Sequence, residues 1–413
     1  MSLRIAILID DFFPASGGIS RSVQTQLEEL TRLGHDVTLI APDRHLVPPP
    51  GVRTIACPVL YKEGLPSHLS VLQPTERRAR RISARAAFDV VHSQTERGAV
   101  VLAARLARLQ NIPHVHTFHA NIAGTHSTLP VKAVFGSLGY EVLVTRALAL
   151  ASKRPPRFTS ALPPRTAEPD NNGFFTRMDW RSLGWIAAHV DRVTSPAQYM
   201  LDNIEAAVAQ PIAGREIRNA SADTFVGVEA TRRTDRSAVR FLSIGRLAKE
   251  KRLDVAIRAF NRAGIPGAEL VIVGDGDQRA RLETLAGPGV RFLGALSERE
   301  AVAEQYLMAD AMVLSSYRFD VQPMVILEAG AAELPVLYCD DRLTAGLSPA
   351  TSRLVAPDMQ ALAVGLREMA EPGRLAALRR GYREVDVRLR PSDMADAYVE
   401  VYEEAIRMPR RHG

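Results

Sequence analysis

The sequence predicts an α/β protein with two doubly wound domains, each built on a parallel sheet. Short apolar runs of strand length alternate with segments of helical periodicity along most of the chain. The alternation begins at the N-terminus and begins again after the polar segment 231–236. The length of 413 residues also suits two or three domains. We therefore expect one domain over 1–230 and a second over 231–390.

The first domain is expected to open with a strand over 4–9, a loop ending in Gly17-Gly18, a helix, and a second strand over 36–41. The continuous apolar run is typical of a strand buried on both faces of a parallel sheet. Because its proline pairs cannot continue a helix, we expect the segment 152–175 to be a long loop. The remaining elements expected here are strands at 90–92, 114–117, 192–194 and 216–218, and helices at 98–109 and 196–208.

The second domain repeats the same order. A strand over 239–244 is followed by a helix over 253–262, a strand over 270–273 and a helix over 277–286. Further strands are expected at 290–292, 311–314 and 335–338. Two such domains facing each other would form a cleft lined by strand carboxyl ends and helix N-termini, where α/β folds bind ligands.

Composition narrows the class of protein. A hydrophobic fraction of 46% and a charged fraction of 24% exclude a disordered chain or a fibre. Two cysteines, Cys57 and Cys339, exclude a disulfide framework. No apolar run reaches the length of a membrane span, and Asp10 and Asp11 interrupt the first one, which argues against a secretory signal. We expect a cytoplasmic protein.

Two glycine-containing loops follow strands and are candidates for binding phosphate. Gly17-Gly18 would let backbone amides approach an anion at a helix N-terminus, although a plain tight turn explains the pair equally well. The loop after the first strand of the second domain carries Arg246 and Lys251. A guanidinium and an ammonium group at that edge could hold a diphosphate. The alternative is a solvated loop with charges at a helix start.

Asp320 and Glu328 lie eight residues apart, Asp320 in a loop and Glu328 on the helix that follows it, which is expected to begin near Pro323. The free amides of that helix N-terminus would lie between two carboxylates able to accept hydroxyl hydrogen bonds. Glu328 stands in an apolar stretch, where a carboxylate requires a partner. Otherwise Asp320 is a turn residue and Glu328 a surface carboxylate.

Histidines gather at the end of the strand over 114–117. His114 and His116 would share one face of the strand. A zinc site formed with His126 is the less favoured alternative. His119, which follows the strand end, is the better candidate for a functional residue.

Basic residues are concentrated in one part of the chain. The net charge is +6, whereas residues 76–165 alone carry 14 Lys and Arg against 4 Asp and Glu. Such asymmetry indicates an acidic partner or, equally, a solvated basic face. Nucleic acid is not expected, because few aromatic side chains accompany the basic ones. The candidates for an anionic surface are Arg77, Arg78, Arg80, Arg81, Arg85, Lys153, Arg154 and Arg157.

Together these motifs resemble glycosyltransferase family 4, the retaining nucleotide-sugar transferases with the GT-B fold of two Rossmann-like domains facing a cleft. The resemblance rests on seven segments in the same order: Phe13–Gly18, 89–92, 116–119, 190–195, 245–251, 273–276 and 320–336. It implies that the last helix, within 391–413, packs back on the first domain. One departure is Asp320, where the family usually has Glu; another is Ala220, where a glycine after Asn219 is common.

The resemblance also implies roles for the candidate residues. The donor diphosphate would be held by Gly17, Gly18, Arg246 and Lys251, and by amides near Met324 and Val325. Asp320 would contact sugar hydroxyls, Glu328 the ribose, and backbone near Leu296 the base. His119 would lie beside the transferred sugar. His119, Arg246, Lys251 and Asp320 are the expected catalytic residues, with no metal and no tightly bound cofactor.

The resemblance therefore implies transfer of a hexosyl group, with retention, from a nucleotide sugar to a hydroxyl acceptor, UDP-sugars being favoured over GDP-sugars. Segments 92–96 and 116–120 are most similar to bacterial diacylglycerol glucosyltransferases, which would place the enzyme peripherally on an anionic membrane with a lipid acceptor. The alternatives are a nucleotide-sugar epimerase or hydrolase on the same fold, and a non-catalytic protein that binds sugar or polyanion.

Overall fold

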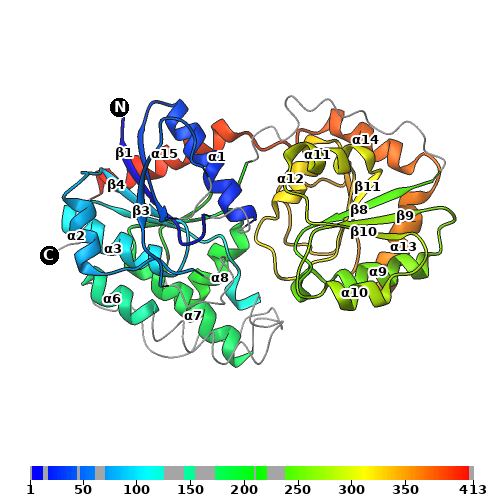
Figure 1. Cartoon of the computed structure of the whole chain (residues 1–413), viewed down its shortest axis with the longest axis horizontal. Helices are drawn as coiled ribbons and strands as arrows, with labels where there is room; N and C mark the ends of the chain where they lie inside the picture. The colour runs from blue at the N-terminus through cyan, green and yellow to red at the C-terminus, as the bar shows by residue number, and fades with distance from the viewer. Residues whose placement is uncertain are drawn as a thin grey trace. The chain divides into compact units, whose positions relative to one another are not determined.

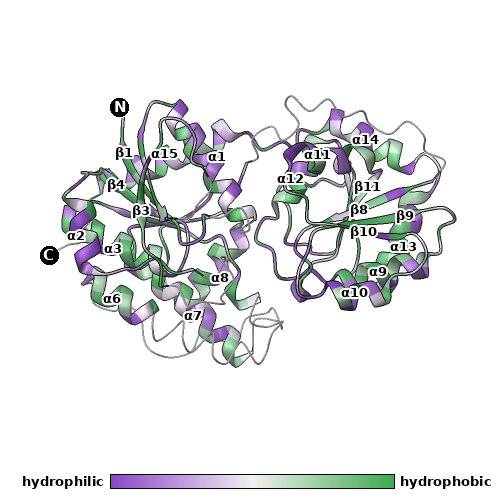
Figure 2. Cartoon of the chain, viewed as in Figure 1, coloured by the Kyte–Doolittle hydropathy of each residue, from purple (hydrophilic) through white to green (hydrophobic). Residues whose placement is uncertain are grey.

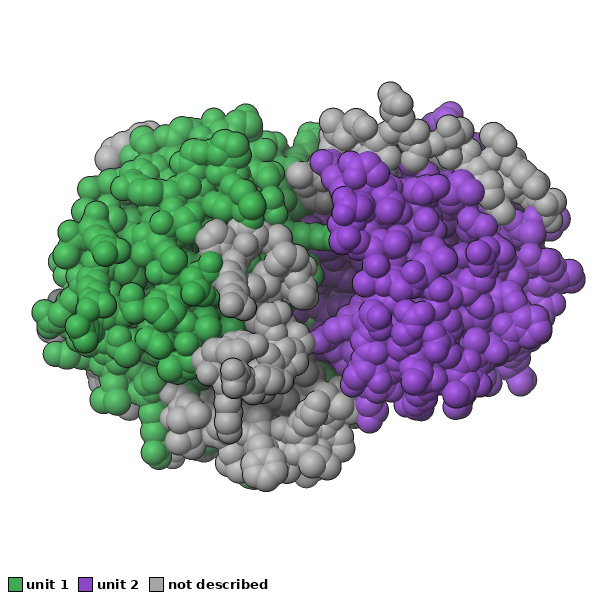
Figure 3. Space-filling view, in the orientation of Figure 1, with its two compact units in different colours: residues 1–220, 390–413 green, residues 221–389 purple. Residues whose placement is uncertain are grey.

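The computed structural model describes residues 2–12, 17–43, 47–60, 70–124, 144–153, 173–208, 211–220 and 238–408. Contacts divide the chain into unit 1, residues 1–220 and 390–413, and unit 2, residues 221–389 (Figure 3). The expected boundary at 230 and the polar segment 231–236 lie outside the described residues. The cleft between the two domains stays a prediction.

Unit 1 is a parallel sheet of seven strands in the order β3-β2-β1-β4-β5-β6-β7, flanked by helices (Figure 1). The strand order reverses direction between β1 and β4, and α/β folds bind ligands outside the strand carboxyl ends at such a point. The strands are β1 (Arg4–Leu8), β2 (Asp36–Pro42), β3 (Arg53–Cys57), β4 (Val90–Ser93), β5 (His114–Thr117), β6 (Arg192–Ser195) and β7 (Gly214–Glu216). The helices used below are α1 (Gly18–Arg32), α2 (Glu76–Ser83), α3 (Gly98–Gln110), α6 (Arg146–Ser152), α7 (Phe174–His189), α8 (Gln198–Val208) and α15 (Pro391–Arg407).

The last helix of the chain belongs to unit 1. Helix α15 contacts α1 and β5, and its tyrosines Tyr398 and Tyr402 are fully buried there. Proline at its first position suits a helix start, because the missing N–H has no partner in that turn. The final helix thus completes the core of the first unit, although unit 2 separates it from that unit in sequence.

Unit 2 is a parallel sheet of six strands in the order β10-β9-β8-β11-β12-β13. The corresponding reversal lies between β8 and β11. Its strands are β8 (Arg240–Ile244), β9 (Glu269–Val273), β10 (Val290–Gly294), β11 (Ala311–Leu314), β12 (Val336–Tyr338) and β13 (Ser352–Leu354). Its helices are η5 (Lys249–Lys251), α9 (Leu253–Ala263), α10 (Arg279–Leu285), α11 (Arg299–Met308), α12 (Met324–Ala331), α13 (Met359–Ala370) and α14 (Arg374–Glu384).

Hydropathy explains which elements the sequence revealed. The central strands are buried on both faces, and β1, β9 and β11 are hydrophobic along most of their length. The elements that the sequence did not predict include β3, α2, α6, α7, α13, α14 and the three-residue edge strand β13. The strand expected at 216–218 instead occupies Gly214–Glu216. Helix α7 buries most of its surface, so its sequence lacks a clear polar face.

Candidate functional site

Unit 2 brings together two of the predicted donor-binding residues. Lys251 ends η5, and its Nζ lies 2.6 Å from Asp320 Oδ1, in the loop before α12. Ser316 Oγ donates to the other carboxylate oxygen of Asp320 at 2.5 Å. Lys251 Nζ also stands 5.1 Å from the centre of the Phe319 ring. A lysine paired in this way can offer its remaining N–H bonds to an anion.

The loop that carries Arg246 is held by close backbone packing. A Cβ atom on Gly274 would lie 1.9 Å from the carbonyl oxygen of Gly245, so only glycine allows the loops after β8 and β9 to meet. Arg246 pairs with Glu250 at 2.5 Å and keeps 49% of its side chain exposed. Arg246 and Lys251 each pair with a different carboxylate, Glu250 and Asp320, and both remain candidates for the diphosphate.

Glu328 has the partner that its apolar surroundings require. It is 2% exposed on α12, and the hydroxyl of Tyr306, a fully buried residue of α11, donates to its Oε2 at 2.5 Å. Sequence reasoning missed Tyr306, because nothing in the pattern of α11 distinguishes it from a core residue. Helix α12 begins at Met324 with Pro323 as N-cap and no side-chain cap, which leaves the first amides of the helix available. Leu296 and Val325 are half-buried beside the core of unit 2.

Gly17 and Gly18 lie at the start of α1. Gly17 has φ 67°, a left-handed conformation that favours glycine, and no atom of the described residues approaches the position of a Cβ. Gly18 is the first residue of the helix. The geometry satisfies both interpretations of the pair, the tight turn and the anion site.

His119 follows β5 at the carboxyl edge of the sheet in unit 1. It is 9% exposed, and burial lowers the pKa of its imidazole to about 4, so the ring is neutral near pH 7. Its Nε2 lies 2.7 Å from Gln94 Oε1, just beyond β4. Behind Gln94, buried hydrogen bonds continue to Gln26, His92 and Tyr402.

The other histidines of β5 do not form a zinc site within the described residues. His114 Nε2 and His116 Nδ1 share the hydroxyl of Ser93, at 2.8 and 2.7 Å. The described part of the chain contains no group of three or more His, Cys, Asp or Glu side chains that could hold a metal ion. His126, the third ligand considered, lies outside the described residues.

An acidic cluster adjoins this edge of the sheet. Asp10 accepts hydrogen bonds from the amides of Leu72 and Ala99, and Asp11 pairs with Arg97 at 2.5 Å. Glu96 is 5% exposed, and burial raises its pKa to about 8, so it is largely protonated at neutral pH. Within the described residues its Oε1 has no hydrogen-bond partner.

The basic residues of α2 and of the turn that follows it are mostly exposed. Arg77, Arg80, Arg81 and Arg85 face solvent, while Ala79 and Ile82 face the core; Figure 2 shows the strongly hydrophilic colour of α2. Lys153 caps the C-terminus of α6, which contacts α3, as α2 does. Arg154 and Arg157 lie outside the described residues. In the part of the chain that the structure describes, no helix is both long and apolar enough to cross a membrane.

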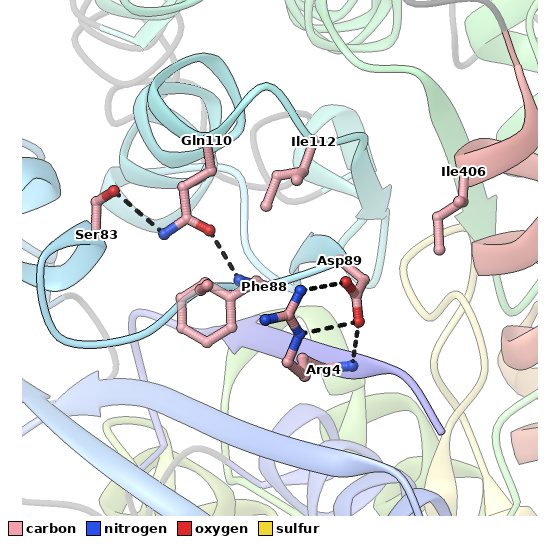
Figure 4. A pocket seen from close by; sticks show the side chains of 8 residues that line it. Arg4, Ser83, Phe88, Asp89, Gln110, Ile112 and Ile406 are labelled. Atoms are coloured by element: carbon pink, nitrogen blue, oxygen red, sulfur yellow. Dashed lines mark hydrogen bonds and ion pairs between the residues drawn. The ribbon is translucent and has the colours of Figure 1, made fainter. Parts of the chain in front are cut away.

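A pocket of about 490 Å³ opens at the opposite edge of the unit 1 sheet (Figure 4). Its polar groups are already paired: Arg4 binds Asp89 at 2.7 Å, and Gln110 accepts from the Phe88 amide at 2.8 Å. It lies where β1 and β4 begin, away from the strand carboxyl ends. It therefore holds none of the predicted site residues.

The two doubly wound domains define the class of fold: the GT-B architecture, known from glycosyltransferases. The solved structure of Anabaena HepE in complex with UDP and glucose matches over 97% of this chain and 99% of that one, with a TM-score of 0.63 and 14% identity. That likeness shows the fold.

The chain belongs to glycosyltransferase family 4. The sequence model "Glycosyltransferase Family 4" matches residues 16–213, and "Glycosyl transferases group 1" matches residues 232–369. A GDP-mannose-dependent alpha-mannosyltransferase of Mycobacterium tuberculosis is 28% identical over 82% of this chain and 79% of its own length. An alpha-monoglucosyldiacylglycerol synthase of Acholeplasma laidlawii is 25% identical over 81% and 80%.

Proposed function

We propose that this glycosyltransferase transfers a hexosyl residue, with retention, from a nucleoside diphosphate sugar to a hydroxyl of a membrane lipid. The observation that carries the donor half is the ion pair between Lys251 and Asp320, two residues 69 apart in sequence. A cation and a carboxylate held together in this way suit a ligand that presents phosphate oxygens and sugar hydroxyls close to one another.

Within unit 2 the proposal assigns one task to each group. Lys251, Arg246 and the free amides at Met324 and Val325 bind the diphosphate and stabilise its charge as it departs. Asp320 binds hydroxyls of the transferred sugar, and Glu328, oriented by Tyr306, binds those of the ribose. These preorganised cations perform the charge stabilisation, so the proposal requires no metal and no resident cofactor.

GDP-mannose is the first donor to test, ahead of the UDP-sugars that the resemblance favoured. The mycobacterial relative is named for dependence on GDP-mannose, whereas the synthase from Acholeplasma leaves a glucosyl donor as the second candidate. The proposal assigns recognition of the base to the backbone near Leu296, whose side chain is half-buried against the core of unit 2.

We expect either GDP or UDP, at about 100 times its dissociation constant, to stabilise the protein by about 2.7 kcal/mol. Thermal unfolding with GDP, UDP, ADP and TDP, in EDTA and then in Mg²⁺, measures the preference. Glu328→Gln keeps the volume and an acceptor for Tyr306 but removes the charge, and it should abolish the shift. Equal shifts with all four nucleotides, or none, would contradict a selective donor site. A shift that appears only with Mg²⁺ would contradict the metal-free assignment.

The proposal of a lipid acceptor rests on the exposed arginines of α2 and of the turn that follows it. Each arginine near an anionic bilayer contributes about 1 kcal/mol, so Arg77→Gln/Arg81→Gln/Arg85→Gln should weaken binding to phosphatidylglycerol vesicles more than tenfold. Co-sedimentation with such vesicles, and with phosphatidylcholine vesicles, measures it. The matched control is Arg374→Gln/Arg380→Gln/Arg383→Gln, which removes the same charge from exposed positions on or beside α14 in unit 2. An equal loss in the control would show that only total charge matters.

Product analysis separates transfer from the alternatives. Wild-type protein with GDP-mannose or UDP-glucose and vesicles containing diacylglycerol should yield a glycolipid in step with nucleotide release. Free sugar without glycolipid would indicate a hydrolase, and an altered nucleotide sugar an epimerase.

A further inference from the structure

A buried chain of hydrogen bonds connects His119 to the last helix of the protein. It runs from His119 through Gln94 and Gln26 to Tyr402, and His92 lies beside it. Gln94, Gln26, His92 and Tyr402 are all 2% exposed or less. These side chains come from β4, α1 and α15 and from the segment after β4, all within unit 1.

The amide groups give this chain a direction. Gln26 Nε2 donates to the Tyr402 hydroxyl at 2.9 Å, and Gln94 Nε2 donates to Gln26 Oε1 at 2.7 Å. The remaining oxygen of Gln94, Oε1, lies 2.7 Å from His119 Nε2. A carbonyl oxygen only accepts. The proton of the neutral His119 ring must therefore be on Nε2.

The far end of the chain is consistent with this direction. The Tyr402 hydroxyl accepts from Gln26 and can donate its own proton to His92 Nδ1, 2.7 Å away. His92 then carries its proton on Nε2, which lies 2.7 Å from Thr117 Oγ1. Burial keeps the pKa of His92 well below its usual value, so that ring is neutral as well. Each member uses its donors and acceptors without conflict.

We propose that Gln94 is a positioning residue that holds His119 in the Nε2–H form, so that Nδ1 presents a lone pair to a hydroxyl of the substrate. No described residue hydrogen-bonds to Nδ1 of His119. The ring thus acts on substrate as a neutral hydrogen-bond acceptor, not as a cation or a proton donor. The tautomer follows from the structure alone, whereas the effect on substrate rests on the proposed function.

The tautomer is measured directly by ¹H–¹⁵N correlation spectra of full-length protein with ¹⁵N-labelled histidine at pH 7.5. The His119 signals are those absent from His119→Asn. We expect a protonated Nε2 and an unprotonated Nδ1. His189 is an internal reference of the opposite kind, since its Nδ1 faces the backbone carbonyl of Trp185 at 2.8 Å and must carry the proton. A proton on Nδ1 of His119 would mean that the amides run the other way and would overturn the proposal.

Two substitutions test the positioning role. Gln94→Glu keeps an acceptor against Nε2–H but adds a charge, so it should preserve the tautomer and raise the pKa of His119 above about 4. The acid limb of kcat should move to higher pH with it. Gln94→Leu removes the acceptor and should give mixed tautomers and a fall in kcat of about tenfold or more, with little change in the KM for donor.

Ser93→Ala is the matched control. It alters a buried residue next to Gln94 that bonds to His114 and His116 but not to His119. It should lower stability and leave the His119 tautomer and the pH profile of kcat unchanged. If the wild type shows the expected tautomer but kcat is unaltered in Gln94→Leu, the proposed role of the His119 ring toward substrate is wrong. Absence of turnover in the wild type with both donors would count against the proposed function, and the spectra would still decide the tautomer.

Discussion

Lys251→Ala is expected to lower kcat/KM for nucleotide release by about 10²–10³, the usual effect of removing one preorganised group that stabilises a developing negative charge. Lys251 is suited to that role because a short ion pair to Asp320 and the Phe319 ring fix its ammonium group. The measurement is steady-state release of GDP or UDP from the donor that stabilises the protein. Lys249→Ala, an exposed lysine on the same turn, is the control and should change kcat/KM less than twofold.

A double substitution separates the two tasks that Lys251 could have. If Lys251 only neutralises Asp320, which is about 10% exposed, then Asp320→Asn should restore the affinity for GDP or UDP that is lost in Lys251→Ala, because these nucleotides lack the sugar that Asp320 is proposed to bind. Asn keeps an acceptor for the Ser316 hydroxyl, which now bonds Asp320 Oδ2. We expect no such rescue, because the diphosphate would still lack its cation. Full rescue would remove Lys251 from the anion site and leave it a structural role.

The sequence predicted the fold through its buried strands, and it indicated a candidate site through loop residues of particular chemistry. Lys251 and Asp320 were identified separately, from their positions after a strand and before a helix, and the structure shows that they touch. Residues whose role lies in a buried contact were out of reach. Tyr306, Gln26 and Tyr402 look like ordinary members of amphipathic helices, and only three-dimensional packing reveals what their polar atoms bind.

The short and peripheral elements also escaped prediction, for a related reason. An edge strand of three residues such as β13 shows no periodicity. Helix α7 buries residues around most of its circumference, so apolar and polar positions do not separate into faces. The effect of Asp320, in place of the usual Glu, on the choice of sugar depends on contacts with a bound donor.

The second large effect concerns stability: Glu96→Gln is expected to raise the unfolding temperature of unit 1 at pH 8 and to do so much less at pH 5. The buried carboxyl has a pKa of about 8 against an ordinary value of 4.5. The folded state therefore binds more protons than the unfolded state between these values. The stability that this group contributes is complete below pH 4.5 and is lost as the pH rises through about 8. At pH 8 the ionisable side chain costs several kcal/mol, at about 1.4 kcal/mol for each unit of pKa.

Tryptophan fluorescence isolates this effect, because the two tryptophans of the chain, Trp180 and Trp185, both lie on α7 of unit 1. His92, His116 and His119 have lowered pKa values, so they reduce stability as the pH falls below 6.5. That contribution is the same in wild type and variant and cancels from their difference. Any fixed cost of burying the new amide cancels likewise between the two pH values.

The matched control is Glu76→Gln, whose carboxylate pairs with Arg105 and Arg108 and has a lowered pKa. It should destabilise the protein by a similar amount at pH 5 and pH 8, because the native carboxylate is ionised at both. If the unfolding temperatures of Glu96→Gln and wild type differ by the same amount at pH 5 and pH 8, Glu96 is ionised in the folded protein. If the difference in unfolding temperature between Glu96→Gln and wild type changes with pH as expected, the Glu96 carboxyl lowers the stability of the protein at neutral pH. This carboxyl lies at the same edge of the sheet as His119. A cost of that kind at the edge of the sheet where α/β folds bind ligands points to selection for activity over stability.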